Sequence, residues 1–410
     1  MCTSTSFRRD FWHRKMGNAV EKRRKNWYNK EDNRHGAACR RARDFLRMVV
    51  MKVKKTAIRI FALLCALGMV FSLCACKSND ETELTEASTT EPTTVETTTA
   101  APKKTDYNRL TGLDNLSKAA KGKRPVAIMI NNIRQSLPQY GIVNADLMFE
   151  CLVEGGITRM MAVFADYTKI PEVCSVRSCR YYFPYFAYGL DAVYICFGCN
   201  PTFGQKALDI TGIDYFDGSK KYDTTLFGRD PARLGKYAKE HTAFVKGPNI
   251  PEVFKSYKIR TDYREDKDDY IFDFRKPKAV GKTACTDVRI NFSDSYYSTF
   301  TYDKDKKVYY KTHTGKPHMD ARANEQLHYT NVFILETDVG LYKNGPLVQM
   351  DWKGGTGYYL SYGTVRKIKW SKKTQADNIV VTDSKGNNIP VNRGNSYIAV
   401  TDYNTTVFPG

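Results

Sequence analysis

One short apolar run, Ile60 to Leu73, divides this chain into a basic N-terminal segment and a longer part that contains the expected folded domains. Four basic residues lie in front of the run: Lys52, Lys54, Lys55 and Arg59. Small residues follow it, and this three-part layout is typical of a secretory signal peptide. This run of 14 residues is too short for a spanning helix, which needs about 20. We therefore expect a signal peptide over residues 51–76; an uncleaved amphipathic anchor is the alternative.

The last four residues of this segment, Leu73-Cys74-Ala75-Cys76, resemble the lipobox of bacterial lipoproteins. In that motif the final cysteine becomes the lipidated first residue of the mature chain, so the resemblance implies lipidation at Cys76. Each buried acyl CH₂ contributes about 0.8 kcal/mol to membrane binding. We expect the protein to be tethered to the cell membrane by this N-terminal lipid and to face outside the cytoplasm.

The segments on either side of the signal offer little to a folded core. Residues 1–50 are basic, and the Lys/Arg run at 22–25 is of the kind that binds nucleic acid. Because a signal peptide normally begins a chain, we interpret residues 1–50 as a leader from a start codon assigned upstream of Met48 or Met51. Residues 77–106 are rich in Thr and Glu and cannot offset their ordering entropy, so they are expected to form a disordered stalk.

The formal net charge of +20 is unevenly divided among these segments. Residues 1–76 carry +13, residues 77–106 carry −4, and residues 107–410 carry +11. Most of the basic excess therefore lies outside the expected folded part, which disfavours nucleic acid as a partner. The remaining charge favours an anionic partner in the cell envelope, either a wall polymer or a lipid headgroup.

The sequence pattern of residues 107–277 predicts a layered α/β domain. Apolar runs at 126–130, 158–164 and 190–198 are typical of buried strands, and residues 144–154 form a helix or a strand before Gly155 and Gly156. Helical signals at 205–208 and 231–241 alternate with these runs. Such alternation favours helices packed on a sheet.

Residues 278–410 predict a small all-β domain, either a barrel or a sandwich. Short segments rich in Val, Ile, Tyr and Thr follow one another, separated by turn clusters such as those at 303–305 and 384–387. The charged stretch at 262–275 is the expected crossing between the two domains. The predicted fold class is therefore α+β, with an N-terminal layered α/β domain followed by a small all-β domain.

Several sequence blocks resemble the YerB-like lipoprotein family of bacterial envelope proteins. They are RPVAIMINN at 124–132, PQYG at 138–141, NAD at 144–146, EGGITR at 154–159, SVRSCR at 175–180, DAVY at 191–194 and GKPHMD at 315–320. The resemblance covers about residues 107–405 and implies a two-domain envelope protein whose function is unassigned. GCNP at 198–201 and His241-Thr242 depart from the family pattern, which has a GGSP-like stretch and His-Asn at these places.

An anion site is predicted where polar residues follow or end the buried strands. The candidate ligands are Arg159, Arg177, Ser178, Arg180 and Arg229. Guanidinium groups match phosphate and carboxylate bidentately, and ligands of α/β sheets bind at the carboxyl ends of strands. Ordinary ion pairing, for example of Arg159 with Glu154 or of Arg229 with Asp230, is the alternative.

A second set of polar residues consists of candidates for ligand contacts or acid–base chemistry: Asn131, Asn132, Glu150, Glu154, His241, His318 and Asp320. The two glutamates lie four residues apart and would share a face if their segment were helical. The two histidines belong to different predicted domains, which could close on a ligand between them. No HExxH or clustered carboxylate set occurs, so we expect no metal site and no cofactor.

Six cysteines follow the lipobox: Cys151, Cys174, Cys179, Cys196, Cys199 and Cys285. An even number outside the cytoplasm permits disulfides. A bridge from Cys174 to Cys179 would clamp the arginine-containing loop, and Cys196 with Cys199 forms a CxxC motif of the redox or metal-binding type. Small buried residues are the simpler interpretation, and the sequence leaves the pairing open.

The sequence as a whole favours a lipid-anchored protein that binds an anionic envelope component. The alternative is an enzyme that acts on a phosphorylated glycan or a lipid-linked precursor through the strand-end arginines. In layout alone, an anchored α/β domain with such arginines resembles the LytR-CpsA-Psr phosphotransferases.

Overall fold

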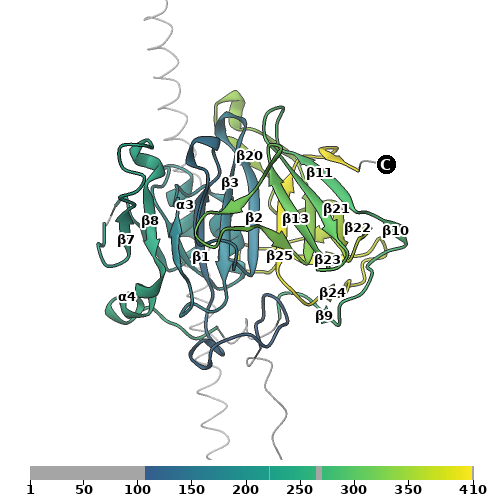
Figure 1. The fold of residues 1–410 in the computed structure, drawn as a ribbon, viewed down its shortest axis with the longest axis horizontal. Coiled ribbons are helices and arrows are strands. Elements are labelled where there is room, and N and C mark those ends of the chain that lie inside the picture. Colours follow the sequence, from purple (N-terminus) through teal and green to yellow (C-terminus); the bar gives the residue numbers. More distant parts are fainter. Residues whose placement is uncertain (1–106, 221, 265–269, 409–410) are drawn as a thin grey trace, which may run out of the picture. The chain divides into compact units, whose positions relative to one another are not determined.

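The computed structural model describes residues 107–220, 222–264 and 270–408 (Figure 1). The predicted leader at 1–50, the signal peptide at 51–76 with its lipidation site Cys76, and the stalk at 77–106 lie outside the described residues. Within the described residues there is no helix long and apolar enough to span a membrane.

An eleven-stranded mixed sheet forms the centre of the fold, in the order β10-β22-β21-β18-β25-β2-β3-β1-β5-β6, with β23 beside β22. The N-terminal half supplies β1 (Val126–Asn131), β2 (Leu147–Val153), β3 (Ile157–Phe164), β5 (Val193–Cys196) and β6 (Tyr215–Asp217). The C-terminal half supplies β10 (Thr283–Ala284), β18 (Asn331–Glu336), β21 (Gly354–Ser361), β22 (Thr364–Ser371), β23 (Val380–Thr382) and β25 (Ser396–Thr401).

The two halves of the chain meet inside this sheet, where β2 pairs in parallel with β25 and Phe149 lies opposite Ile398. Figure 1 shows β2 of the N-terminal half beside the yellow β25. Both strands are almost entirely buried, as expected of parallel strands covered on both faces. The regions predicted as two domains therefore share one hydrogen-bonded sheet.

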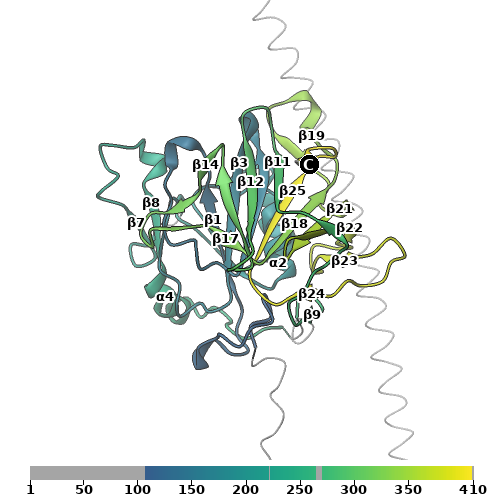
Figure 2. The same ribbon diagram turned by 45° about the vertical axis from the view of Figure 1, so that its right-hand side comes forward.

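A second sheet, antiparallel, covers one face of the central sheet (Figure 2). Its strands are β11 (Asp287–Asn291), β12 (Tyr297–Asp303), β13 (Val308–His313), β14 (Lys316–Pro317), β17 (His328–Tyr329) and β26 (Thr406–Val407). Alternate residues of β13 are buried, so one face of this sheet packs inward. Phe300 of β12 contacts Tyr397 of β25, with ring centroids 4.6 Å apart.

Helices cover the opposite face of the central sheet. The ring of Phe186 in α2 (Tyr182–Gly189) stacks on Phe149 of β2 at 5.3 Å, and Leu208 of α3 (Gly204–Thr211) joins the same apolar cluster. The helix α4 (Ile250–Ser256) packs instead in the cluster on the other face, with β4 (Glu172–Cys174), β7 (Phe227–Arg229) and β8 (Ala243–Lys246). Short paired strands complete the fold: β9 (Phe274–Arg275) with β24 (Val391–Asn392), β15 (Met319–Asp320) with β16 (Glu325–Gln326), and β19 (Val339–Leu341) with β20 (Val348–Met350).

The predicted fold class is confirmed: the N-terminal region is mixed α/β with few helices, and the C-terminal region is largely antiparallel β. The helix predicted over residues 231–241 is wrong. This segment forms turns that end in a short 3₁₀ helix, Lys239–His241, and Gly235 has a φ of 78°, in the left-handed region that terminates helices. The buried Arg233 donates to the carbonyl of Ser136 at 2.9 Å, so tertiary hydrogen bonds override the local helix propensity.

Candidate anion site and the buried ion pair

The arginine segment, residues 175–180, fills the gap where the parallel strands β1 and β5 separate. The two strands pair as far as Ile128 and Ile195. Beyond that point the backbone N–H of Asn131 donates to the Ser175 carbonyl at 2.8 Å, and the backbone N–H of Phe197 donates to the Arg177 carbonyl at 3.0 Å. The segment therefore extends the sheet at the carboxyl ends of β1 and β5, which is the edge where α/β sheets bind ligands.

Arg159 lies at the same edge because β3 runs antiparallel to β1 and Arg159 is paired with Asn131. Its Nη1 donates to the Ser178 carbonyl at 2.8 Å, its side chain is 5% exposed, and its Nε has no hydrogen-bond partner among the described residues. Burial and the neighbouring guanidinium groups lower the pKa of Arg159 to about 9. A buried guanidinium group with a free N–H donor favours the binding of an anion, which would supply both the missing hydrogen bond and the opposite charge.

Three further arginines complete the arginine cluster, which we define as Arg159, Arg177, Arg180 and Arg229. Arg177 makes a long ion pair with Glu240 at 3.8 Å, and burial lowers its pKa, assisted by Arg180 and Arg229. Arg229 lies over the ring of Phe197 at 4.5 Å. Ser178, the other predicted anion ligand, donates through Oγ to the Phe197 carbonyl at 3.1 Å. All five predicted anion-site residues therefore lie at this edge of the sheet.

The ion pairs proposed as the alternative to an anion site are replaced by others. Glu154 pairs with Arg180, at 2.5 Å between Oε2 and Nε, and Asp230 pairs with Arg233 at 3.4 Å. Within the described residues, Arg159 and Arg229 have no carboxylate within 4.0 Å. The cluster therefore keeps an excess of positive charge.

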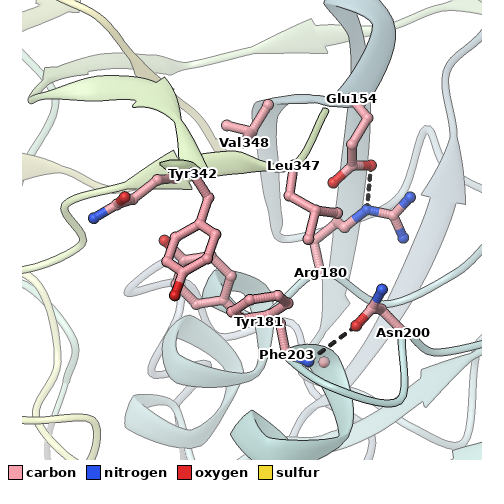
Figure 3. A pocket seen from close by; sticks show the side chains of 10 residues that line it. Glu154, Arg180, Tyr181, Asn200, Phe203, Tyr342, Leu347 and Val348 are labelled. Atoms are coloured by element: carbon pink, nitrogen blue, oxygen red, sulfur yellow. Dashed lines mark hydrogen bonds and ion pairs between the residues drawn. The ribbon is translucent and has the colours of Figure 1, made fainter. Parts of the chain in front are cut away.

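An aromatic cavity of about 210 Å³ opens beside Arg180 (Figure 3). It is lined by Glu154, Arg180, Tyr181, Asn200, Phe203, Gly204, Tyr342, Leu347, Val348 and Gln349. The rings of Phe203 and Tyr342 meet edge to face at 4.9 Å, and the Arg180–Glu154 ion pair forms one wall. Arg180 therefore belongs both to the arginine cluster and to the wall of an apolar cavity.

The second predicted set of residues is divided between two places. Glu150 on β2 is fully buried and pairs with the equally buried Lys311 of β13 at 3.2 Å. Lys311 Nζ contacts His318 Nδ1 at 3.0 Å, and the Asn132 amide donates to Glu150 Oε1 at 3.0 Å. Asn132, Glu150 and His318 thus meet in one closed network between the two sheets.

The directions of the pKa shifts agree with a charged pair of Glu150 and Lys311 between the two sheets. Burial alone would raise the pKa of Glu150, but Lys311, His313 and several hydrogen bonds hold it below its usual value. Burial lowers the pKa of Lys311, and the charge of Glu150 opposes that change. Because every member is at most 2% exposed, we assign this network to holding the sheets together rather than to binding.

Glu150 and Glu154 do not form the helical pair considered from the sequence. Glu150 lies within strand β2, and Glu154 follows the strand in a 3₁₀ turn (Glu154–Gly156) at the aromatic cavity. A strand rises about 3.3 Å per residue, so the two glutamates lie much farther apart than residues on adjacent turns of a helix.

His241 and Asn131 lie next to the arginine cluster, with His241 Nδ1 2.8 Å from Asn131 Nδ2. Burial, followed by the charge of Arg177, lowers the pKa of His241. His241 and His318, which were predicted to face one ligand, do not contact each other directly. Gln139 lies between them: its Oε1 is 2.9 Å from His318 Nε2, and its Nε2 donates to the Asn131 carbonyl at 2.8 Å.

Asp320 is buried and holds a loop of the N-terminal half. Its Oδ2 accepts the backbone N–H groups of Ile142 at 2.7 Å and Val143 at 3.1 Å. Asp320→Asn removes the charge from these bonds, so we expect the free energy of unfolding to fall by about 1.5 kcal/mol in a urea titration. The exposed Asp338→Asn, as a control, should change it by less than about 0.5 kcal/mol. Equal effects of the two substitutions would contradict this role for Asp320.

Two family models match the chain and together span both halves of the sheet. The model described as "Protein of unknown function (DUF3048) N-terminal domain" matches residues 110–260, and the corresponding C-terminal domain model matches residues 288–398. The chain belongs to the DUF3048 family.

The relatives of this DUF3048 protein agree with the resemblance seen in its sequence. It is 27% identical over 298 residues to "Putative lipoprotein YerB" of Bacillus subtilis (strain 168), a match that covers 71% of this chain and 85% of that protein. The crystal structure of YerB protein from Bacillus subtilis matches with a TM-score of 0.63 at 24% identity, over 74% of this chain and 99% of that chain. The predicted YerB-like membership is confirmed, and the solved structure shows the same fold.

The aromatic cavity lies where the two DUF3048 domains meet. Tyr181 and Phe203 belong to the part matched by the N-terminal model, and Tyr342 belongs to the part matched by the C-terminal model. Sequence reasoning missed these aromatic residues because nothing in the sequence distinguishes them from ordinary core aromatics. Among the described residues no group of three or more His, Cys, Asp or Glu side chains could hold a metal ion.

Proposed function

We propose that this DUF3048 protein is a membrane-anchored lipoprotein that binds an anionic amphiphile of the cell envelope. The arginine cluster would receive the charged headgroup, and the aromatic cavity would receive the adjoining apolar part. The observation that carries the proposal is the position of Arg180. Its Nε lies 2.5 Å from Glu154 Oε2 on the cavity wall, and its charge lowers the pKa of both Arg159 and Arg177.

The arginine cluster supplies the affinity for charge. Four guanidinium groups converge on one edge of the sheet with Glu154 and Glu240 as their paired carboxylates. An anion placed there would oppose the effects of burial and of repulsion by Arg180 and Arg177, which together lower the pKa of Arg159. Guanidinium forks suit phosphate because two parallel N–H donors can meet two of its oxygens.

The aromatic cavity favours an amphiphile over a uniformly polar polymer. Tyr181, Phe203, Tyr342, Leu347 and Val348 give it an apolar lining. Its volume of about 210 Å³ lies below the range of about 300–1,000 Å³ for complete small-molecule sites. It would therefore hold part of a ligand, such as the start of an acyl chain, while the headgroup remains at the arginines.

A lipid tether would keep this site close to such ligands. The match to a relative named as a lipoprotein supports an anchor of the kind predicted at Cys76. Residues 77–106 would then separate the lipid from the folded part. The charge of +11 on residues 107–410 would further favour the anionic surface of the envelope.

The alternative function, an enzyme acting on a phosphorylated glycan or a lipid-linked precursor, needs an acid or base beside the arginines. Glu154 is engaged by Arg180, and His241 is engaged by Asn131. The binding function needs no such group, so the contacts at the site support it better.

Vesicle sedimentation tests the proposal directly. A soluble form starting at Lys77, which lacks the lipid, would be mixed with phosphatidylglycerol vesicles, with phosphatidylcholine vesicles, and with an immobilised polyglycerol-phosphate polymer. We expect retention on phosphatidylglycerol that weakens as salt rises, and little retention on phosphatidylcholine. Retention on the polymer alone would assign the site to a wall polymer, and retention on neither anionic probe at about 0.15 M salt would contradict the proposal.

A further inference from the structure

Cys179 and Cys199 lie side by side in the extension of the sheet that the arginine segment forms. The two residues are bridge partners in parallel orientation, and the Cys179 amide donates to the Gly198 carbonyl at 2.9 Å. Neighbouring strands lie about 4.8 Å apart, inside the Cα–Cα range of about 4.4–6.8 Å that disulfides span. The backbone therefore already has a spacing that a disulfide can bridge.

The two side chains point to the same side of this extension. Each thiol donates to the carbonyl of the residue after it, at 3.6 Å for Cys179 and 3.7 Å for Cys199, and each thiol changes the pKa of the other. Both sulfur atoms also face Gly204, where an added Cβ would lie 2.6 Å from Cys199 Sγ and 3.6 Å from Cys179 Sγ. Glycine at 204 thus leaves room for Cys199 Sγ, and Cys179 Sγ lies within contact distance of the same place.

The two thiols differ in a way that suits disulfide exchange. Cys199 is half-buried, whereas the other five cysteines in the described residues are buried. The neighbouring Cys179 thiol lowers the pKa of the Cys199 thiol, while burial raises that of Cys179. A partly exposed thiol of lowered pKa is the one that reacts first with an oxidant.

We propose that Cys179 and Cys199 form a reversible disulfide, in preference to the Cys196–Cys199 pair that the CxxC motif suggests. The oxidant is a disulfide, either a small molecule or a thiol–disulfide oxidoreductase, of the kind present outside the cytoplasm. The Cys199 thiolate attacks one sulfur of that disulfide, breaks its S–S bond, forms a mixed disulfide and releases one thiolate.

The second step closes the bridge. The Cys179 thiol loses its proton and attacks Cys199 Sγ, which forms the Cys179–Cys199 bond and releases the second thiolate. The two cysteines together lose two electrons and two protons, and the oxidant leaves as two thiols. Cys196 remains reduced because Cys199 is the bridge partner of Cys179, and the sulfur atoms of these two residues both face Gly204.

The bridge would tie together two walls of the aromatic cavity. Arg180 follows Cys179, Asn200 follows Cys199, and both line the cavity. Oxidation would therefore fix the distance between the arginine segment and the loop that begins α3. Any effect of this on ligand binding rests on the proposed function, whereas the formation of the disulfide does not.

Peptide mapping of the full chain tests the pairing. The protein, purified in detergent, would be treated with oxidised glutathione, alkylated, digested without reduction and analysed by mass spectrometry. We expect one cross-linked peptide that joins Cys179 to Cys199 and disappears after reduction. A Cys196–Cys199 peptide, glutathione retained on Cys199, or alkylation of both Cys179 and Cys199 would overturn the proposal.

Two matched variants sharpen the result. Cys179→Ala and Cys196→Ala each remove a fully buried thiol from the same apolar cluster. Cys196→Ala should keep the cross-link, and Cys179→Ala should lose it and retain glutathione on Cys199. The reverse pattern would overturn the assignment. If Cys179→Ala fails to fold, the map of the unsubstituted chain still decides, because it identifies the joined cysteines directly.

Discussion

Lys311→Met is expected to lower the free energy of unfolding by about 3–5 kcal/mol. The substitution keeps an unbranched side chain, one heavy atom shorter, but leaves the carboxylate of Glu150 without its cation in a site that is 0% exposed. Tyr397 at 2.8 Å and Asn132 at 3.0 Å still donate to Glu150, but neither carries a compensating charge. The measurement is a urea titration at pH 7, and the loss is large because domains are stable by only about 5–15 kcal/mol.

A second substitution separates the charge from the packing. In the double variant Glu150→Gln with Lys311→Met, no charge is left unpaired, so it should be more stable than Lys311→Met alone. The exposed pair of Lys123 with Asp262 provides the control, and Lys123→Ala should cost less than about 1 kcal/mol. If Lys311→Met were as stable as the unsubstituted protein, or if the double variant were the least stable, the buried pair would not have the role assigned to it.

The strands were the part of the fold most open to prediction. Val126–Asn131 is a continuous apolar run and forms a strand buried on both faces, and the Val, Ile and Tyr-rich segments after residue 278 form the expected antiparallel strands. The pairing of β2 with β25 could not be predicted, because it joins residues about 250 positions apart through backbone groups that every residue carries. A sequence shows which residues favour a strand but not which distant strand they pair with.

The candidate site shows the same division. Arg159 reaches this edge near the start of β3, which is antiparallel to β1, so no rule for parallel strands placed it there. The position of Arg177 and Arg180 beyond the carboxyl ends of β1 and β5 followed from the rule that ligands of α/β sheets bind at this edge. The aromatic cavity did not, because Tyr181 and Tyr342 are 161 positions apart in the sequence and look like ordinary core residues.

Lys311 was absent from the sequence candidates, although one signal pointed to it. Tyr309, Lys311 and His313 alternate along β13 and all face inward, so a lysine on the apolar face of a strand implied a buried partner. The identity of that partner, Glu150 on another sheet, depended on how the two sheets pack.

The double substitution Arg177→Gln with Arg180→Gln is expected to weaken the binding of an anionic amphiphile by about 100-fold, because it removes two charge-assisted contacts of about 1.5 kcal/mol each. The side chains are 29% and 21% exposed, so the melting temperature should change little. Arg177→Lys with Arg180→Lys keeps the charge without the bidentate fork and should bind with intermediate affinity. The half-buried Arg289 and Arg366 give a matched control pair elsewhere on the protein.

Calorimetric titration with dihexanoyl phosphatidylglycerol tests the central claim most directly, because this ligand combines an anionic headgroup with short acyl chains. We predict that the control double variant, Arg289→Gln with Arg366→Gln, has a Kd for this lipid within about threefold of that of the unsubstituted protein. The double variant of the cluster, Arg177→Gln with Arg180→Gln, should bind the lipid about 100-fold more weakly. Equal affinities for the two double variants, or no binding by the unsubstituted protein, would contradict the assignment of the arginine cluster and the aromatic cavity as the binding site.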